Sequence, residues 1–347
     1  MFRSFSALAI AFGALAVSVA AAAQTSPRTA AAAGAIHRGV NVLGYDPLWE
    51  DSSRARFRTS HFRIIRDGGF DFVRINLQAF RHMDAQNRLP ARWFSILDKM
   101  VAAAREAGLS VILDEHDFEA CAKSVPECRT RLLAFWEQVA PHYARQPQSV
   151  LFELLNEPHG KLDDDAWNDL LVEALGLVRR TNPERTVVIG PSSWNSFRNL
   201  EKLRLPSGDH DIVVTIHYYE PFNFTHQGAS WTDLKKLHGV AWGSAAERAQ
   251  PAADFAKVAD WSRINKRPIL LGEFGAYDAS GTPLALRTAY IGTVARAAEA
   301  NGFSWAHWQF DRDFELYDID RGRWVDPIKD ALIPAERQPP SHPAKGN

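Results

Sequence analysis

The sequence is poor in cysteine and carries almost no excess of charge of either sign. Of its 347 residues only Cys121 and Cys128 are cysteine, and the formal net charge at pH 7 is −1. A chain so close to neutral lacks the charged surface that would favour nucleic acid or an anionic membrane as its main partner. No histidine or further cysteine stands near the two thiols, so they would make a poor zinc site.

Several motifs are missing as well. The sequence contains no H-x-H or H-E-x-x-H pattern of a metal-dependent hydrolase, and no glycine-rich phosphate loop precedes its last predicted helices. It shows no internal repeat and no second domain. Its composition, 46% hydrophobic and 23% charged, is ordinary for a globular protein. We therefore expect one globular domain that uses no cofactor and no metal, and a monomer.

An apolar segment at the N-terminus is typical of a signal peptide. Arg3 precedes the apolar residues 5–19, and the small residues 20–23 form a cleavage site. The apolar run is too short for a confident membrane-spanning helix, and no cysteine follows it to carry a lipid. We expect residues 1–23 to be removed, residues 24–35 to form a disordered lead-in, and the mature protein to be secreted or periplasmic without membrane contact.

Export makes a disulfide possible. Cys121 and Cys128 lie close together in a polar stretch that contains Pro126. We expect a bond between them that closes a small loop. Two free thiols and a metal pair remain the alternatives.

Between residues 36 and 335, strand-like runs alternate with helix-like segments. The helix-like segments are 60–67, 90–106, 129–144, 164–181, 245–265 (interrupted at Pro251) and 283–300. The strand-like runs are 39–44, 70–77, 109–113, 150–157, 186–190, 212–217, 268–272 and 303–308. Alternation indicates a parallel α/β protein, and the count of eight favours a closed (β/α)8 TIM barrel. Residues 336–347 are expected to form a flexible tail.

Two of the predicted strands end in a carboxylate. The run from 150 to 155 is apolar apart from Glu153 and stops at Asn156, Glu157 and Pro158, and the run from 268 to 272 stops at Glu273. Carboxyl ends of barrel strands surround the site where such barrels carry their chemistry. Two carboxylates at that rim are the minimal equipment for hydrolysing a glycosidic bond.

Further polar residues are predicted to point into the same rim, because strand residues alternate sides. Asp114 and His116 share one side of the third strand, and His217 and Tyr219 share one side of the sixth. Glu153 would share a side with Glu157 but lie deeper, and we expect it to form a buried ion pair under the site. Asp114 and Glu115 are expected to be structural.

Taken together, the motifs resemble glycoside hydrolase family 5, the retaining β-glycanases, and in particular a bacterial endoglucanase branch. The matching pieces, in family order, are Arg74, His116, Asn156-Glu157-Pro158, His217-Tyr218-Tyr219, Gly272-Glu273-Phe274-Gly275 and Trp308. They span nearly the whole mature chain. Asn-Glu-Pro by itself is moderately specific, whereas the ordered set is strongly so.

The resemblance implies a role for each matching residue. Glu157 would be the general acid and base, and Glu273 the nucleophile, kept ionised by Arg74. Asn156 would hydrogen-bond the sugar 2-OH. Tyr219 would steady the nucleophile by a hydrogen bond. His116 and His217 would bind sugar hydroxyls or tune the two acids. Trp308 would form a platform under the sugar.

Other aromatic residues are weaker candidates. Trp194, followed by Asn195, could line a neighbouring sugar subsite. Either Trp231 or Trp242 could stack on substrate from the long loop after the sixth strand. Two histidines, His159 and His226, could reach the rim, but nothing in the sequence selects them.

The leading hypothesis is a secreted endo-β-1,4-glucanase that acts on a β-glucan polysaccharide or oligosaccharide. A β-mannanase or a mixed-linkage β-glucanase would use the same catalytic set. Two hypotheses come from other classes. A non-catalytic carbohydrate-binding barrel is disfavoured because both carboxylates are present. A metal-dependent hydrolase built on His116, His217, Glu157 and Glu273 is disfavoured because the sequence contains no metal-binding motif.

Overall fold

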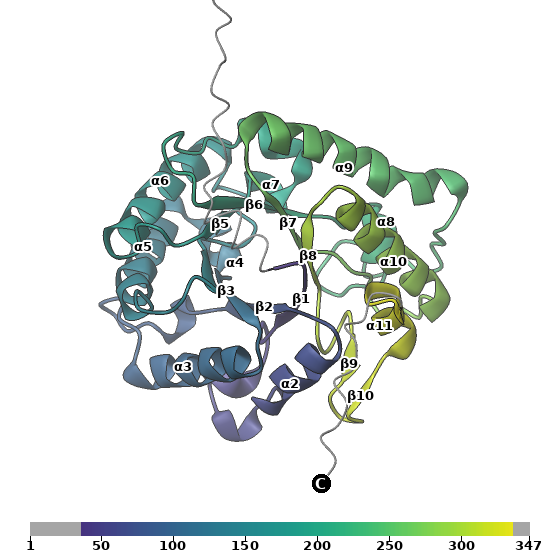
Figure 1. Ribbon diagram of the computed structural model, residues 1–347, viewed down its shortest axis with the longest axis horizontal. Coiled ribbons are helices and arrows are strands. Elements are labelled where there is room, and N and C mark those ends of the chain that lie inside the picture. Colours follow the sequence, from purple (N-terminus) through teal and green to yellow (C-terminus); the bar gives the residue numbers. More distant parts are fainter. Residues whose placement is uncertain (1–35, 336–347) are drawn as a thin grey trace, which may run out of the picture.

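Eight parallel strands close into a barrel surrounded by helices in the computed structural model, which describes residues 36–335 (Figure 1). Neighbours in the barrel follow chain order, and β1 closes the ring against β8. The strands are β1 (Arg38–Val42), β2 (Phe72–Leu77), β3 (Ser110–Glu115), β4 (Val150–Glu153), β5 (Val187–Ile189), β6 (Ile212–His217), β7 (Ile269–Glu273) and β8 (Ser304–His307). The predicted (β/α)8 barrel is confirmed. The predicted signal peptide, lead-in and tail lie outside the described residues.

Six long helices form the outer ring: α2 (Ser60–Asp67), α3 (Ala91–Glu106), α5 (Val125–His142), α6 (Asp164–Thr181), α9 (Ala245–Asn265) and α10 (Leu284–Ala300). Their ends follow local rules. The side chain of Asp163 caps α6 by accepting a hydrogen bond from the backbone of Ala166, and Ser244 and Glu247 form a reciprocal capping box at α9. None of the described helices has the length and apolar character of a membrane-spanning segment.

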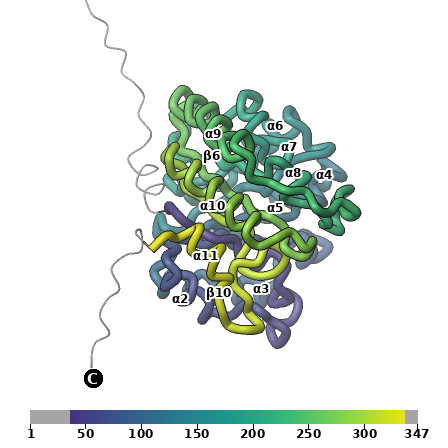
Figure 2. The backbone as a smooth tube through the Cα atoms, turned by 90° about the vertical axis from the view of Figure 1, so that its right-hand side faces the viewer, coloured from purple at the N-terminus to yellow at the C-terminus, as the bar shows by residue number. Residues whose placement is uncertain are grey.

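Shorter helices, turns and a two-stranded ribbon lie in the loops between these elements or after β8. They are α4 (Phe118–Lys123), α7 (Ser192–Asn195), α8 (Phe222–Thr225), α11 (Asp326–Leu332), the two-stranded ribbon β9 (Tyr317–Asp318) and β10 (Arg323–Trp324), and 3₁₀ turns at Pro47–Trp49, Ser52–Arg54, Phe80–His82 and Phe197–Lys202. Figures 1 and 2 place the yellow segment from β9 to α11 beside the purple segment around α2. Trp324 stacks there on Phe70, so the last and first parts of the chain are packed together.

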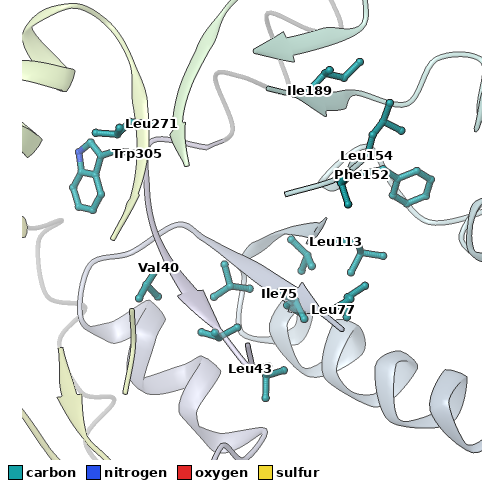
Figure 3. Packing of buried hydrophobic residues seen from close by; sticks show 14 of the residues in the cluster. Val40, Leu43, Ile75, Leu77, Leu113, Phe152, Leu154, Ile189, Leu271 and Trp305 are labelled. Atoms are coloured by element: carbon teal, nitrogen blue, oxygen red, sulfur yellow. The ribbon is translucent and has the colours of Figure 1, made fainter. Parts of the chain in front are cut away.

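The inside of the barrel is apolar near the amino ends of the strands. Alternate residues fill the inside of the barrel with a separate apolar layer: Ile36, Phe72, Ile112, Leu151, Val188, Val213, Leu270 and Ala306. The residues between them face the helices and join the larger core, of which Figure 3 shows Ile75, Leu113, Phe152 and Leu271. Beyond the inner apolar layer the inward side chains become polar, and the site begins there.

Two local expectations about the helices were wrong, and one about the cysteines was right. The predicted helix 129–144 begins at Val125, with Pro126 in its first turn, and α4 precedes it. The predicted bond between Cys121 and Cys128 is confirmed; it closes a short loop and joins buried positions of α4 and α5. Pro251 does not interrupt α9, which continues through it. A proline removes one N–H and so weakens a helix, but the packed face of α9, with Phe255, outweighs that loss.

Candidate active site

Arg74 of β2 lies at the centre of the barrel mouth and is completely buried. Its Nε and Nη2 bind the two carboxylate oxygens of Glu153 at 2.7 and 2.9 Å, and its Nη1 donates to Glu273 Oε1 at 2.8 Å. Asp114 Oδ2 lies 3.1 Å from Nη2. The predicted buried ion pair of Glu153 beneath the site is confirmed. One guanidinium thus compensates three buried carboxyl groups, which fixes their positions.

Glu273 ends β7, one residue beyond the predicted end of that strand. Between β6 and β7 the register shifts, so that His217 is paired with Glu273. A Cβ on Gly272 would stand 2.4 Å from Oγ1 of Thr215 and 3.0 Å from the His217 ring, so only glycine fits at this bulge. The shift brings the Glu273 side chain to the level of His217.

Tyr219 and Arg74 hold opposite oxygens of Glu273. The Tyr219 hydroxyl donates to Oε2 at 3.0 Å, while Arg74 binds Oε1. Burial raises the pKa of Glu273, whereas His217 and Arg74 act in the lowering direction. The carboxylate is therefore immobilised by two donors, which is what a nucleophile that must attack from one direction requires.

Glu157 lies beyond the end of β4. The ladder stops at Glu153, and the predicted continuation of the strand to residue 157 was wrong: Glu157 has a left-handed backbone, with φ of 42°. The turn lifts its carboxyl group to the rim, where Oε1 lies 2.6 Å from Nδ1 of His217. Burial raises the pKa of Glu157 to about 7 and lowers that of His217 to about 4, so at neutral pH the imidazole is uncharged.

The two carboxyl groups face each other across a short gap. A carboxylate oxygen of Glu157, a ring nitrogen of His217 and a carboxylate oxygen of Glu273 all lie within 4.8 Å of one another. The oxygens of the two carboxyl groups therefore approach to 4.8 Å or less. Retaining glycosidases place their carboxyl groups about 5–5.5 Å apart, and inverting ones about 6.5–9.5 Å. The separation is that of a retaining pair. The same three residues could also hold a metal ion.

His116 and Trp308 form a stacked pair at the mouth. Their ring centroids are 5.6 Å apart and their planes differ by 5°. Nδ1 of His116 lies 2.6 Å from Oδ2 of Asp114, which orients the ring. Trp308, just past the end of β8, is 7% exposed; His116 stacks on it and Tyr45 packs against it edge-on.

Asn156 is held between Arg74 and His116. Its Oδ1 accepts a hydrogen bond from Arg74 Nη2 at 2.8 Å, and its Nδ2 lies 3.5 Å from His116 Nε2. Because the oxygen is committed to the guanidinium, the amide nitrogen is the group left to donate to a substrate hydroxyl. Asn156 is thereby oriented for the contact expected of it.

The aromatic candidates separate into rim and core. Trp194 is 53% exposed and stacks on His159 with ring centroids 4.5 Å apart. Trp231 is 55% exposed and packs edge-on against Tyr277. Trp242 is buried against Tyr290, so Trp231 is the exposed one of the two loop tryptophans that could stack on substrate. His226 is also buried, stacked on Phe222.

These features agree with the matched family model. A model described as cellulase, glycosyl hydrolase family 5, matches residues 34–313. The chain belongs to glycosyl hydrolase family 5. The resemblance inferred from the ordered motifs is confirmed, and the protein is a glycoside hydrolase similar to endoglucanases.

Solved structures share the whole barrel of this family 5 enzyme. Thermotoga maritima Cel5A, in structures described as complexes with cellobiose and with mannotriose, is 35% identical over 87% of this chain and 99% of that chain, with a TM-score of 0.83. Endoglucanase 3 of Fibrobacter succinogenes is 24% identical and matches 89% of this chain. The chain spans 54%, 31% and 62% of the first three curated relatives, so it covers only part of their length.

Two buried asparagines of this family 5 barrel contact the site but were not predicted from the sequence. Asn41 accepts from Arg74 Nη1 at 2.8 Å, and Asn76 donates to Asn41 and to Asp114. Both are completely buried inside predicted strands. A polar amide within an otherwise apolar run is the signal that could have found them, since a buried amide needs partners.

Proposed function

We propose that the protein is a secreted endo-β-1,4-glucanase that cleaves β-glucan chains with retention of configuration. The observation that carries this proposal is the gap between the carboxyl groups of Glu157 and Glu273, which leaves no room for the intervening water of an inverting enzyme. The glucan assignment is supported by the endoglucanases among its relatives.

In the first step, a Glu273 carboxylate oxygen attacks the anomeric carbon while Glu157 gives its proton to the glycosidic oxygen, which leaves with the aglycone sugar. A pKa of about 7 keeps much of Glu157 protonated for this transfer at neutral pH. In the second step, Glu157 takes a proton from water as the water oxygen displaces Glu273. Asn156 Nδ2 would donate to the sugar 2-OH during both steps.

Direct evidence for the two roles would come from separate variants. Glu273→Gln should abolish release of reducing sugar from carboxymethyl cellulose while the protein stays folded. Glu157→Ala should also be slow, but azide should accelerate it, because a small anion can enter the vacated space and attack the glycosyl-enzyme on the face that water would use. NMR of the first product should show the β-anomer. Full activity of Glu273→Gln, or an α-anomer, would refute the mechanism.

Substrate and action pattern need their own measurement. Rates on carboxymethyl cellulose, barley β-glucan and glucomannan, with Glu273→Gln as control, separate a cellulase from a mixed-linkage glucanase and a β-mannanase. The mannotriose complex of Thermotoga maritima Cel5A makes the mannan arm worth testing. Endo action predicts that viscosity falls well before reducing ends accumulate. Strong cleavage of glucomannan alone would keep the mechanism and change the substrate.

Export is proposed from the N-terminal segment alone. Expression of the full chain should give a mature protein that begins at Gln24 and is found outside the cytoplasm. An intact Met1 on cytoplasmic protein would refute the proposal.

The metal-dependent alternative has a test of its own. Loss of activity with EDTA, restored by a divalent ion, would favour it.

A further inference from the structure

Asn195 lies behind the site and not on the substrate side of it. It is completely buried, unlike its neighbour Trp194, which is half exposed. Ser193, Trp194 and Asn195 all have left-handed backbones, with φ of 58°, 60° and 54°. Within this run Trp194 is exposed and stacks on His159, whereas Asn195 is buried against His217. This differs from the expectation that the pair could line a sugar subsite.

The Asn195 amide contacts the imidazole that touches Glu157. Its Nδ2 lies 3.2 Å from Nε2 of His217, and Nδ1 of the same ring lies 2.6 Å from Oε1 of Glu157. Room for the amide depends on Gly190, where a Cβ would stand 2.1 Å from Asn195 Oδ1. Asn195, His217 and Glu157 thus form a chain of three groups that ends at the proposed acid.

We propose that Asn195 is a positioning residue that fixes His217 as the tautomer with its proton on Nδ1, and so sets which oxygen of Glu157 is available to carry a proton. An amide N–H that donates to Nε2 requires a lone pair there, and a neutral imidazole then has its hydrogen on Nδ1. That hydrogen is donated to Oε1 of Glu157. The exchangeable proton of Glu157 is left to Oε2, free of His217.

The opposite tautomer would work against acid catalysis. With Nδ1 unprotonated, the proton of Glu157 would be donated to the ring at Oε1 and would be withheld from the glycosidic oxygen. Other charged or titratable groups also face this pair: Arg74, Asp114, His116, Glu153, Glu273, His159, Tyr45 and Tyr219. Of these, His159 contacts the neighbouring Trp194, and the other seven are left in place by a substitution at residue 195. Variants at residue 195 are therefore expected to act mainly through His217.

The tautomer can be read directly by NMR of ring nitrogens in the wild-type protein, with the His217 signals assigned by their loss in His217→Gln. We expect a protonated Nδ1 and an unprotonated Nε2 at pH 7. The reverse pattern would overturn the inference, and this reading requires neither a variant at residue 195 nor activity.

Two substitutions then test the link to Glu157 through the pH profile of kcat/KM. Asn195→Asp should raise the pKa of His217, place an imidazolium beside Glu157 and move the basic limb to lower pH by about one unit. Asn195→Leu removes the donor, so it should reduce kcat by about tenfold and move the basic limb to higher pH. Asn199→Ala is the matched control, because Asn199 binds Ser192, Ser193 and Asp164 in the same loop but not His217.

The inference rests on the proposed role of Glu157, and the outcomes separate the two. If Asn195→Asp and Asn195→Leu fold and keep the wild-type basic limb, Asn195 does not act on the acid and the inference fails. If these variants raise KM but leave the basic limb of the pH profile where it is in the wild type, the substitution has only displaced Trp194, and the inference also fails. Full activity of Glu157→Gln would instead refute the proposed function, while the NMR reading would still judge the contact between Asn195 and His217.

Discussion

The hydroxyl of Tyr219 donates a hydrogen bond to Oε2 of Glu273 at 3.0 Å. Because the bond is made to a charged acceptor, it is worth about 1.5–3 kcal/mol. Tyr219→Phe should therefore lower kcat by about 10- to 100-fold with little change in KM. Tyr218→Phe is the matched control, since the Tyr218 hydroxyl binds Asp254 away from the site. Equal kcat values for Tyr219→Phe and wild type would show that the contact is dispensable.

The acid should be visible in the pH dependence of activity. Glu157 must be protonated in the first step, and burial raises its pKa to about 7. We expect kcat/KM to fall above about pH 7 as Glu157 ionises. His217, with a pKa near 4, stays neutral across this range and adds no second transition. A basic limb above pH 9 would contradict the assignment.

The same group should make the fold less stable at high pH. A carboxyl group with a raised pKa binds its proton more tightly when folded, so its contribution is complete below its ordinary pKa and is lost as pH rises through about 7. Glu157→Gln should be more stable than wild type at pH 8, by on the order of 1–3 kcal/mol, and should gain much less at pH 4.5. Chemical unfolding at both pH values measures this, and the exposed Glu201→Gln serves as control. An unchanged difference between the two pH values would argue against it.

Arg74 should be the most costly side chain of the site to remove. It is fully buried and compensates Asp114, Glu153 and Glu273. Removing one partner of a buried ion pair costs about 3–5 kcal/mol, so Arg74→Met should lose at least that much stability in urea. Arg88→Ala, which breaks an exposed pair with Asp84, should lose less than about 1 kcal/mol. Similar losses in both variants would disprove the central role of Arg74.

The disulfide is expected to stabilise the wall of the site. Cys121 and Cys128 close a loop of about eight residues, for which the chain-entropy relation gives about 2.5 kcal/mol. α4 carries Phe118, whose ring packs against His116 and His159. The double variant Cys121→Ser/Cys128→Ser should therefore melt at lower temperature and lose some activity before it unfolds. Reduction of the wild type should reproduce the effect and leave the double variant unchanged.

Much of this protein could be predicted locally. The apolar runs, their spacing and the helix ends predict eight strands in a parallel barrel, because strand and helix patterns depend on nearby residues. The Asn156-Glu157 pair and Glu273 were found because each stands at the end of a mostly apolar run, and Arg74 and His116 because they fit an ordered set of motifs. The sequence could not choose between Trp231 and Trp242, since a loop tryptophan can be buried or exposed, and packing of Trp242 against Tyr290 decides that it is buried.

By itself the sequence determined the barrel, the family and the two carboxylates at its rim. Tertiary structure alone decided how those carboxylates meet. The register shift at Gly272 turns Glu273 level with His217, and the left-handed turn at Glu157 carries the second carboxyl to the same ring. Both depend on contacts between strands far apart in the chain. The position of Asn195 also depends on the tertiary structure. Three consecutive left-handed residues and the absence of a side chain at Gly190 allow its amide to contact His217.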